Sequence, residues 1–351
     1  MIDSAWLRRL LSPLAMIYGL VVRARLALYR AGILASRGLP GRVISVGNLT
    51  VGGTGKTPCV AFIANYLRGQ GSEVAILSRG YRRQSRGRLE VSDGVRMRHG
   101  PAASGDEPWL LAQSCPGVRV VVDARRYEAG KWLAERTPVS VFLLDDGYQH
   151  LRLVRQLNLL LIDATDPLDQ ARLVPLGRLR EPLVEMRRAD AVIVTRGDQP
   201  FDRSRLEVLL HRYLRPGTPV FLAWHELTSL RRLAAEEKVD ASHFRGRRVA
   251  AIAGLARPER FFHDLRGLGI EMAWNQAFPD HHRYTVGEMR EICDAAQAAG
   301  AQALLITEKD AANLPPEAIA LAPLPIYAAS IEFRCREEDE FKRLLRGEMA
   351  R

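Results

Sequence analysis

The chain has 351 residues, 47% of them hydrophobic, which favours two domains with packed cores and excludes a globally disordered protein. Its formal net charge is +11, but the basic excess is spread along the chain, mostly as arginine. With no basic stripe, RNP aromatic pair or zinc knuckle, we predict no nucleic-acid partner. The cysteines lack C-x-x-C spacing, which argues against a disulfide framework or zinc site and fits a reducing compartment: Cys59, Cys115, Cys293 and Cys335.

The first expected element is an apolar segment between arginines at residues 6–30. Its apolar run, residues 10–22, is shorter than the roughly 20 residues that a spanning helix needs. No small-residue cleavage site follows, which disfavours a signal peptide. We interpret residues 1–35 as an amphipathic helix at a membrane surface, because flanking arginines suit anionic lipid. A helix packed on its own domain is the alternative.

Residues 36–220 alternate short apolar runs with helical stretches. The runs are rich in Val, Ile and Leu without strict alternation, which is typical of strands buried on both faces of a parallel sheet. We expect strands at 43–46, 74–77, 118–122, 141–144, 157–162 and 191–194, and helices at 58–71, 107–115 and 127–136. This order predicts a doubly wound α/β domain.

A second α/β pattern occupies residues 221–345. Strands are expected at 247–255, 303–307 and 325–333, and helices at 257–269 and 286–300. Residues 231–246 hold an acidic pair and a lysine, and we interpret them as a linker or a peripheral segment. The sequence therefore predicts a second, smaller α/β domain at the C-terminal end.

The stretch VISVGNLTVGGTGKTP, residues 43–58, carries a P-loop-like motif between a strand and a helix. Thr50 stands where the pattern G-x-x-x-x-G-K-[ST] has its first glycine. Backbone N–H groups at a helix N-terminus bind phosphate, so Lys56 would contact the β- and γ-phosphates and Thr57 would bind Mg²⁺. An ordinary glycine-rich turn is the alternative. The predicted nucleotide-binding residues are Thr50, Val51, Gly52, Gly53, Thr54, Gly55, Lys56 and Thr57.

Two carboxylates follow the apolar strand in VFLLDDGYQH, residues 141–150. Asp145 or Asp146 would face the Mg²⁺ at the phosphate loop, in the position of a Walker B element. A solvated turn is the alternative. Gln149 and His150 lie just beyond and could orient a substrate or the acidic pair.

Two further segments hold candidate catalytic residues. In SGDEP, Asp106 and Glu107 begin a helix, and taken alone, helix capping by Asp106 is the simpler explanation. In FPDHHRYT, Asp280, His281 and His282 share a loop. A histidine that is oriented by an aspartate and acts as a base is favoured over a metal site, because no third ligand cluster has suitable spacing.

Eight motifs occur in an order that resembles the tetraacyldisaccharide 4'-kinase (lipid A 4'-kinase) family over residues 1–315: GNLTVGGTGKTP, LSRGY, GDEP, DDGYQH, LREP, AGLARPERFF, FPDHHRY and TEKDA. The family's own loop carries threonine in place of the first glycine. The resemblance implies two P-loop-like α/β domains with the active site between them, and ATP and Mg²⁺ as cofactors. The implied reaction phosphorylates the 4'-hydroxyl of a tetraacyldisaccharide 1-phosphate to give lipid IV-A. The implied place is the cytoplasmic face of the bacterial inner membrane, for a peripheral or monotopic protein that we expect to be a monomer.

The resemblance also implies a role for each matching residue. Asp106 would be the base, working with His281 beside Asp280, and Lys56 would serve the phosphates. Residues near the metal would be Thr57, Glu107 and Asp145, and residues that support the site would be Asp146, Gln149 and His150.

Three positions depart from the family pattern: Arg82 replaces a common glycine, Arg178 a usual proline and Asn313 a frequent lysine. We expect them to affect contacts at the edge of the substrate and not the core chemistry.

Two other classes of protein stay open. A P-loop switch ATPase, GTPase or metal-insertion chaperone would leave FPDHHRY without a role. A membrane-binding module with a vestigial loop is disfavoured by the intact Lys56 and Thr57.

Overall fold

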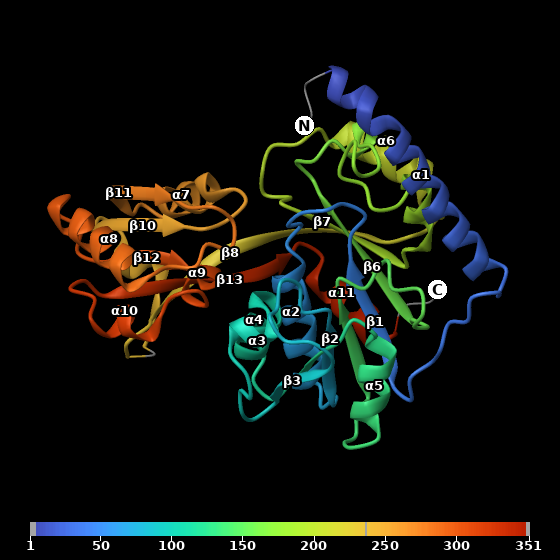
Figure 1. The fold of residues 1–351 in the computed structure, drawn as a ribbon, viewed down its shortest axis with the longest axis horizontal. Helices are drawn as coiled ribbons and strands as arrows, with labels where there is room; N and C mark the ends of the chain where they lie inside the picture. Colours follow the sequence, from blue (N-terminus) through green and yellow to red (C-terminus); the bar gives the residue numbers. More distant parts are fainter. Residues whose placement is uncertain (1–4, 236, 349–351) are drawn as a thin grey trace.

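The computed structural model describes residues 5–235 and 237–348, which form two α/β lobes on one 13-stranded sheet. We call residues 5–223 and 333–348 the larger lobe and residues 227–330 the smaller lobe, because their hydrophobic cores separate at these positions. Figure 1 shows the smaller lobe at the left and the larger lobe at the right, joined by the long strands β8 (Val220–Arg232) and β13 (Ile326–Cys335).

The larger lobe is built on a sheet in the order β8-β7-β6-β1-β5-β2-β4-β3, in which β3 runs antiparallel to β4 and the other neighbours pair in parallel. Its further strands are β1 (Arg42–Gly47), β2 (Val74–Ser78), β3 (Leu89–Asp93), β4 (Arg119–Val122), β5 (Val141–Asp145), β6 (Leu157–Asp163) and β7 (Ala191–Thr195). Every residue of β2, β5, β6 and β7 is buried, as their continuous apolar pattern predicts.

Helices cover both faces of this sheet, since adjacent residues of β1 point into different cores: Ile44 packs with helices α2 and α4, and Val43 with α5. The helical segments are α2 (Lys56–Gly69), α3 (Pro101–Ser104), α4 (Asp106–Ser114), α5 (Arg126–Ala134) and α6 (Arg203–Tyr213), with 3-10 turns η1 (Leu168–Gln170) and η2 (Leu183–Arg188). After β1 the chain builds the half of the sheet that contains β2 to β5. It then crosses to the other side of β1 and continues with β6. The carboxyl end of β1 is therefore the switch point at which such sheets bind ligands.

The smaller lobe carries the parallel strand order β11-β10-β12-β13, with β9 added antiparallel to β8. Its further elements are β9 (Lys238–Asp240), η3 (Ala241–Phe244), β10 (Arg248–Ala253), α7 (Pro258–Gly267), β11 (Glu271–Ala277), α8 (Val286–Ala298), β12 (Leu304–Thr307), α9 (Glu308–Ala311) and α10 (Pro316–Ala320). Thr285 and Glu288 form a capping box that starts α8, which fixes where the loop carrying His281 ends.

The two lobes share backbone hydrogen bonds. Strands β8 and β13 pair antiparallel from Tyr327 opposite Arg232 to Cys335 opposite Ala223. Beyond β13, helix α11 (Glu338–Arg346) packs on α2 through the buried Phe341. Helix α11 thus lies in the larger lobe, although its residues 338–345 fall within the range 221–345 predicted for the smaller domain.

Helix α1 (Ala5–Arg30) runs along the outside of the larger lobe (Figure 1). Val22 and Leu26 pack against Leu151, and the Tyr18 hydroxyl donates to the Arg180 carbonyl at 2.8 Å. Apolar side chains that are at least 54% exposed lie elsewhere on the helix: Leu14, Met16, Ile17, Leu20 and Val21. By length and composition alone, Leu11–Arg30 is long enough and apolar enough to cross a membrane, although the apolar run predicted a helix too short to span.

All strands expected from the sequence are present to within two residues at each end, but β3, β8, β9 and β11 were not predicted. Strand β11 lies at the sheet edge with the sequence EMAWNQA, and its polar residues hide the strand pattern. Of the two interpretations of residues 231–246, the linker is wrong, whereas a peripheral segment agrees with β9 pairing with β8 beside the main strand order. These residues include the end of β8, β9 and η3, and Phe244 is buried in the core of the smaller lobe.

Candidate active site

A cleft between the lobes is lined by residues 50–58 of the larger lobe and by residues 255–257, 280–281 and 307–309 of the smaller lobe. The phosphate loop enters it from the carboxyl end of β1, and its residues 51–53 are exposed. Gly55, directly before α2, has φ of 77°, and a Cβ here would come within 2.0 Å of the His225 ring. The last glycine of the motif is thus required by backbone conformation and by packing.

A segment between β6 and β7 braces the phosphate loop. The Val51 N–H donates to the Arg178 carbonyl at 2.7 Å, and the Arg180 guanidinium donates to the Thr50 carbonyl at 2.9 Å. The same guanidinium donates to both carboxylate oxygens of Asp146, at 2.7 and 3.0 Å. Such a two-pronged contact fixes orientation as well as distance.

Lys56, predicted to serve the phosphates, is held at the start of α2. Its Nζ donates to Asn48 Oδ1 at 3.1 Å and lies 3.5 Å from Asp146 Oδ1. Burial acts against ionisation of Asp146, but Lys56 and Arg180 outweigh it and hold the pKa of Asp146 at about 2. Asp146 therefore stays ionised and orders both cations beside the loop.

Asp145, the last residue of β5, is 2% exposed. The Ser78 hydroxyl donates to its Oδ2 at 2.8 Å. Burial, with the charges of Glu107 and Asp146, raises the pKa of Asp145 to about 7. A buried carboxylate beside like charges is stabilised by a cation, so these oxygens fit a divalent metal ion.

Asp106 is the first residue of α4, but Gly105 occupies the N-cap and no side chain caps this helix. The capping interpretation of Asp106 is therefore wrong. Its Oδ2 lies instead 2.8 Å from Nδ1 of His281, which reaches across from the smaller lobe. Since an ionised carboxylate can only accept, His281 donates from Nδ1. Asp280 Oδ2 lies 3.7 Å from the other ring nitrogen.

The electrostatics of Asp106 favour its ionised form. Burial raises its pKa, but hydrogen bonds from His281 and Asn313 and the charge of Lys309 outweigh this, so the pKa lies below its ordinary value. The neighbouring Glu107 lines the cleft, and its Oε1 lies 3.8 Å from Lys309 Nζ of α9. Two side-chain contacts, Asp106 with His281 and Glu107 with Lys309, thus join α4 to the smaller lobe.

His282, the neighbour of His281, belongs to the packing of the smaller lobe. Its Nε2 lies 3.1 Å from Glu288 Oε1, and its ring stacks on Phe278 with centroids 4.8 Å apart. Of the two histidines, His281 is the one that meets Asp106.

Gln149 and His150 are not among the described residues that line the cleft. Gln149 Nε2 donates to the backbone carbonyl of Asn48 at 2.9 Å. The backbone carbonyl of Gln149 accepts from the Arg25 guanidinium of α1 at 2.8 Å. Gln149 therefore supports the phosphate loop and links it to α1. Burial, with the charge of Arg126, lowers the pKa of His150 to about 3, so this ring is neutral.

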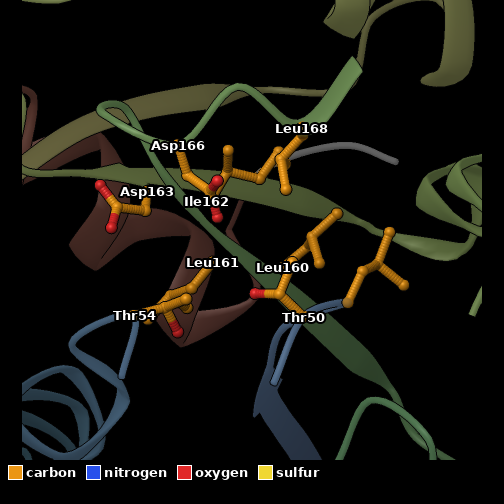
Figure 2. Close-up of a pocket in the computed structure, with 9 residues that line it drawn as sticks. Thr50, Thr54, Leu160, Leu161, Ile162, Asp163, Asp166 and Leu168 are labelled. Carbon is orange, nitrogen blue, oxygen red and sulfur yellow. The ribbon is translucent and has the colours of Figure 1, made fainter. Parts of the chain in front are cut away.

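Sequence reasoning assigned no role to Arg180 or Asp163. Arg180 lies in the LREP motif, which was used only as a family marker. Asp163 ends β6 and is 5% exposed, and it is paired with Arg196. Figure 2 shows Asp163 near Thr54 of the phosphate loop, in a small pocket behind that loop. Asp163 ends a buried strand, as Asp145 does, and this position in the sequence could have indicated that it lies near the phosphate loop.

The three departures from the family pattern differ in their surroundings. Arg82 has φ of 58°, a left-handed conformation that explains why glycine is common there. Arg178 pairs with Asp166. Asn313 is the departure that contacts a predicted catalytic residue, because its Nδ2 donates to Asp106 Oδ2 at 3.2 Å.

Comparisons with known proteins identify the family of the chain. A family model described as tetraacyldisaccharide-1-P 4'-kinase matches residues 7–350. The chain belongs to this family. Proteins named tetraacyldisaccharide 4'-kinase are similar to it: that of Geobacter metallireducens is 41% identical over 92% of this chain and 93% of that protein, and that of Geobacter sulfurreducens is 43% identical over 91% and 87%.

A solved structure is also similar over nearly the whole chain. LpxK from Aquifex aeolicus, described as an "apo" form in complex with ATP, is 34% identical with a TM-score of 0.78, over 97% of this chain and 99% of that one. Membership of the tetraacyldisaccharide 4'-kinase family confirms the predicted kinase activity, and the likeness to LpxK confirms the predicted α/β fold.

Proposed function

We propose that the chain transfers the γ-phosphate of ATP to the 4'-hydroxyl of a tetraacyldisaccharide 1-phosphate and so forms lipid IV-A in lipid A biosynthesis. The observation that carries this proposal is the pairing of Asp106 with His281 across a cleft that also holds the phosphate loop. A P-loop alone suits any nucleotide hydrolase. A carboxylate–imidazole pair that spans the two lobes across the same cleft suits activation of an acceptor hydroxyl.

The nucleotide would bind along residues 50–57. The backbone N–H groups of this glycine-rich loop and the N-terminus of α2 would receive the phosphates. Lys56 would move from Asp146 toward the β- and γ-phosphates. There its positive charge would offset the negative charge of the phosphoryl group in the transition state. Arg180 would keep Asp146 in place during this exchange, since it holds both carboxylate oxygens.

Asp106 would act as the base for the acceptor. Its carboxylate would take the proton as the O–H bond of the 4'-hydroxyl breaks, while the hydroxyl oxygen bonds to the γ-phosphorus and the bond to ADP breaks. His281, donating from Nδ1, would hold the carboxylate in place. Because the transition state of phosphoryl transfer is loose, a carboxylate of modest basicity suffices, and positioning supplies most of the effect.

Asp145 and the Thr57 hydroxyl would hold Mg²⁺, with Glu107 near the ion. Among the described residues no three His, Cys, Asp or Glu side chains gather as a ready-made metal site. Mg²⁺ commonly binds one or two protein carboxylates, and its remaining oxygen ligands come from phosphate and water. When bound, the ion would neutralise charge on the β- and γ-phosphate oxygens.

The acyl chains of the proposed substrate require the active site to meet a bilayer. The apolar side chains that α1 exposes, together with its arginines, support peripheral or monotopic attachment at the cytoplasmic face of the bacterial inner membrane. Contacts of α1 with Gln149 and Arg180 would connect this attachment to the phosphate loop. A single chain supplies both sides of the cleft, which suits a monomer.

The test is transfer of label from γ-³²P-ATP to a tetraacyldisaccharide 1-phosphate in detergent micelles, for the wild type and Asp106→Ala. We expect labelled lipid with the wild type and a loss of about 10²-fold or more in the variant. Labelled lipid without that loss would remove Asp106 from the role of base. ATP hydrolysis without labelled lipid would favour a switch ATPase instead.

A further inference from the structure

Asn313 lies just after α9 in the smaller lobe and makes two side-chain contacts. Its Nδ2 donates to Asp106 Oδ2 at 3.2 Å and to the Lys309 carbonyl at 3.0 Å. Both partners are acceptors, so the amide nitrogen and not the amide oxygen must face them. The orientation of this amide is therefore set by its surroundings.

We propose that Asn313 is a positioning residue that fixes the Asp106 carboxylate for transfer of the acceptor proton. This inference deepens the proposed function and rests on the role of Asp106 as the base. Asn313 itself would not touch the reacting atoms, because it acts through one oxygen of Asp106.

The two donors to Asp106 converge on the same oxygen. His281 Nδ1 and Asn313 Nδ2 both donate to Oδ2, and within the part of the chain that the structure describes Oδ1 accepts no hydrogen bond. Two donors on one oxygen fix the rotation of the carboxylate more firmly than one donor. The unoccupied Oδ1 is thus held in a fixed direction, where a substrate hydroxyl could donate to it.

One network in the smaller lobe carries both donors. Asp310, 1% exposed, accepts from the Gly254 N–H and the Tyr284 hydroxyl, each at 2.8 Å. The Gly254 carbonyl accepts from the His281 N–H at 3.2 Å, and the Asn313 carbonyl accepts from the Tyr284 N–H at 3.3 Å. His281 and Asn313 are therefore joined in one hydrogen-bonded network, and both reach Asp106 in this arrangement of the smaller lobe and α4.

The experiment measures kcat and the KM for ATP of the full chain in the labelled-lipid assay, for Asn313→Leu and Asn313→Asp. Leucine is close in volume but donates nothing, and aspartate keeps the shape but places a like charge against Asp106. We expect Asn313→Leu to lower kcat roughly ten- to hundredfold, the value of a hydrogen bond to a charged group, and Asn313→Asp to lower it further. The KM for ATP should stay within about twofold, since the phosphate loop is not touched.

A double-mutant cycle with Asp106→Ala separates positioning from a structural role. If Asn313 acts through Asp106, adding Asn313→Leu to Asp106→Ala causes little further loss. An equal loss in both backgrounds, or equal losses for leucine and aspartate, would overturn the inference and assign Asn313 to the local fold around Lys309. Asn275→Leu, on the exposed edge strand β11, is the matched control and should keep full activity.

The same measurements separate this inference from the proposed function. If Asp106→Ala keeps its activity, the proposed base is wrong and the inference falls with it. If Asp106→Ala is inactive but Asn313→Leu matches the wild type, only the inference is overturned. Thermal unfolding of each variant shows whether it is folded. If Asn313→Leu does not fold, the test rests on Asn313→Asp.

Discussion

His281 stands 175 residues after Asp106 in the chain, yet its Nδ1 lies 2.8 Å from Asp106 Oδ2. The two side chains come from different lobes, so the candidate active site exists only when both lobes are in place.

The two adjacent histidines should differ sharply in their effect on catalysis. We expect His281→Gln to lower kcat by about 10²-fold, because Asp106 loses the donor that holds it. His282→Gln should lower kcat less than threefold, since His282 meets Glu288 and Phe278 in the smaller lobe. Steady-state kinetics with both variants checks this, and a larger loss in His282→Gln would reverse the assignment.

Arg180→Lys should weaken ATP binding. Lysine cannot hold both Asp146 oxygens and the Thr50 carbonyl at once, so the phosphate loop loses its brace. We expect the KM for ATP to rise about tenfold, with a smaller change in the KM for lipid. Arg205→Lys, in the surface pair with Asp169, is the control and should leave both constants unchanged. Unaltered ATP kinetics in Arg180→Lys would mean that the brace is dispensable.

Asp310→Ala should destabilise the smaller lobe. The change leaves the Gly254 N–H and the Tyr284 hydroxyl buried without their acceptor. We expect the free energy of unfolding to fall by about 3 kcal/mol, measured by urea denaturation. The exposed Asp294→Ala on α8 should change it by less than about 0.5 kcal/mol.

Stability should fall as the pH falls below neutral, in part because of His225. Burial lowers the pKa of His225 from 6.5 to about 4 in the folded chain. Between these two values the unfolded chain binds a proton that the folded chain does not, so the free energy of unfolding decreases from pH 7 toward pH 4. His225→Gln should show a weaker decrease in urea denaturation across this range, and the exposed His243→Gln should behave like the wild type.

Charges on the exposed side of α1 should reduce membrane binding. Met16 and Leu20 are 70% and 63% exposed, so replacing both with glutamate should leave folding intact. We expect a large decrease in co-sedimentation with anionic lipid vesicles, because apolar contact is lost and negative charge is added. Val208→Glu on α6 removes a side chain that is 69% exposed and is the control. Equal sedimentation of all three proteins would exclude α1 as the anchor.

The strands of both lobes could be predicted because they are buried on both faces and their apolar runs are continuous. The phosphate loop could be predicted because it directly follows such a strand, and Asp145 because it ends one. Strand β8 could not, since its 13 residues pass from one core to the other and its burial pattern changes along its length. Strand β11 could not, because an edge strand needs few apolar residues.

The pairing of Asp106 with His281 was implied by the family resemblance but could not be derived from residue spacing. Nothing local to GDEP or FPDHH shows that they face each other, because their distance depends on how the smaller lobe sits over α4. For the same reason the sequence did not show the contact of Asn313 with Asp106, and Asn313 was expected to affect only contacts at the edge of the substrate. The role of Arg180 could not be predicted because its partners are the backbone of the phosphate loop and Asp146. A hydrogen bond to a backbone carbonyl does not depend on the identity of the residue that carries it, so the sequence does not show it.

The antiparallel pairing of β8 with β13 makes the smaller lobe an insertion within the chain of the larger one. The chain departs along β8 and returns along β13, and α11 then completes the larger lobe by packing on α2. Because the two junctions lie side by side, the inserted module can be gained, lost or exchanged as a unit without breaking the central sheet. A chimaera that keeps α11 while replacing the module should therefore still fold its larger lobe, which thermal unfolding would check.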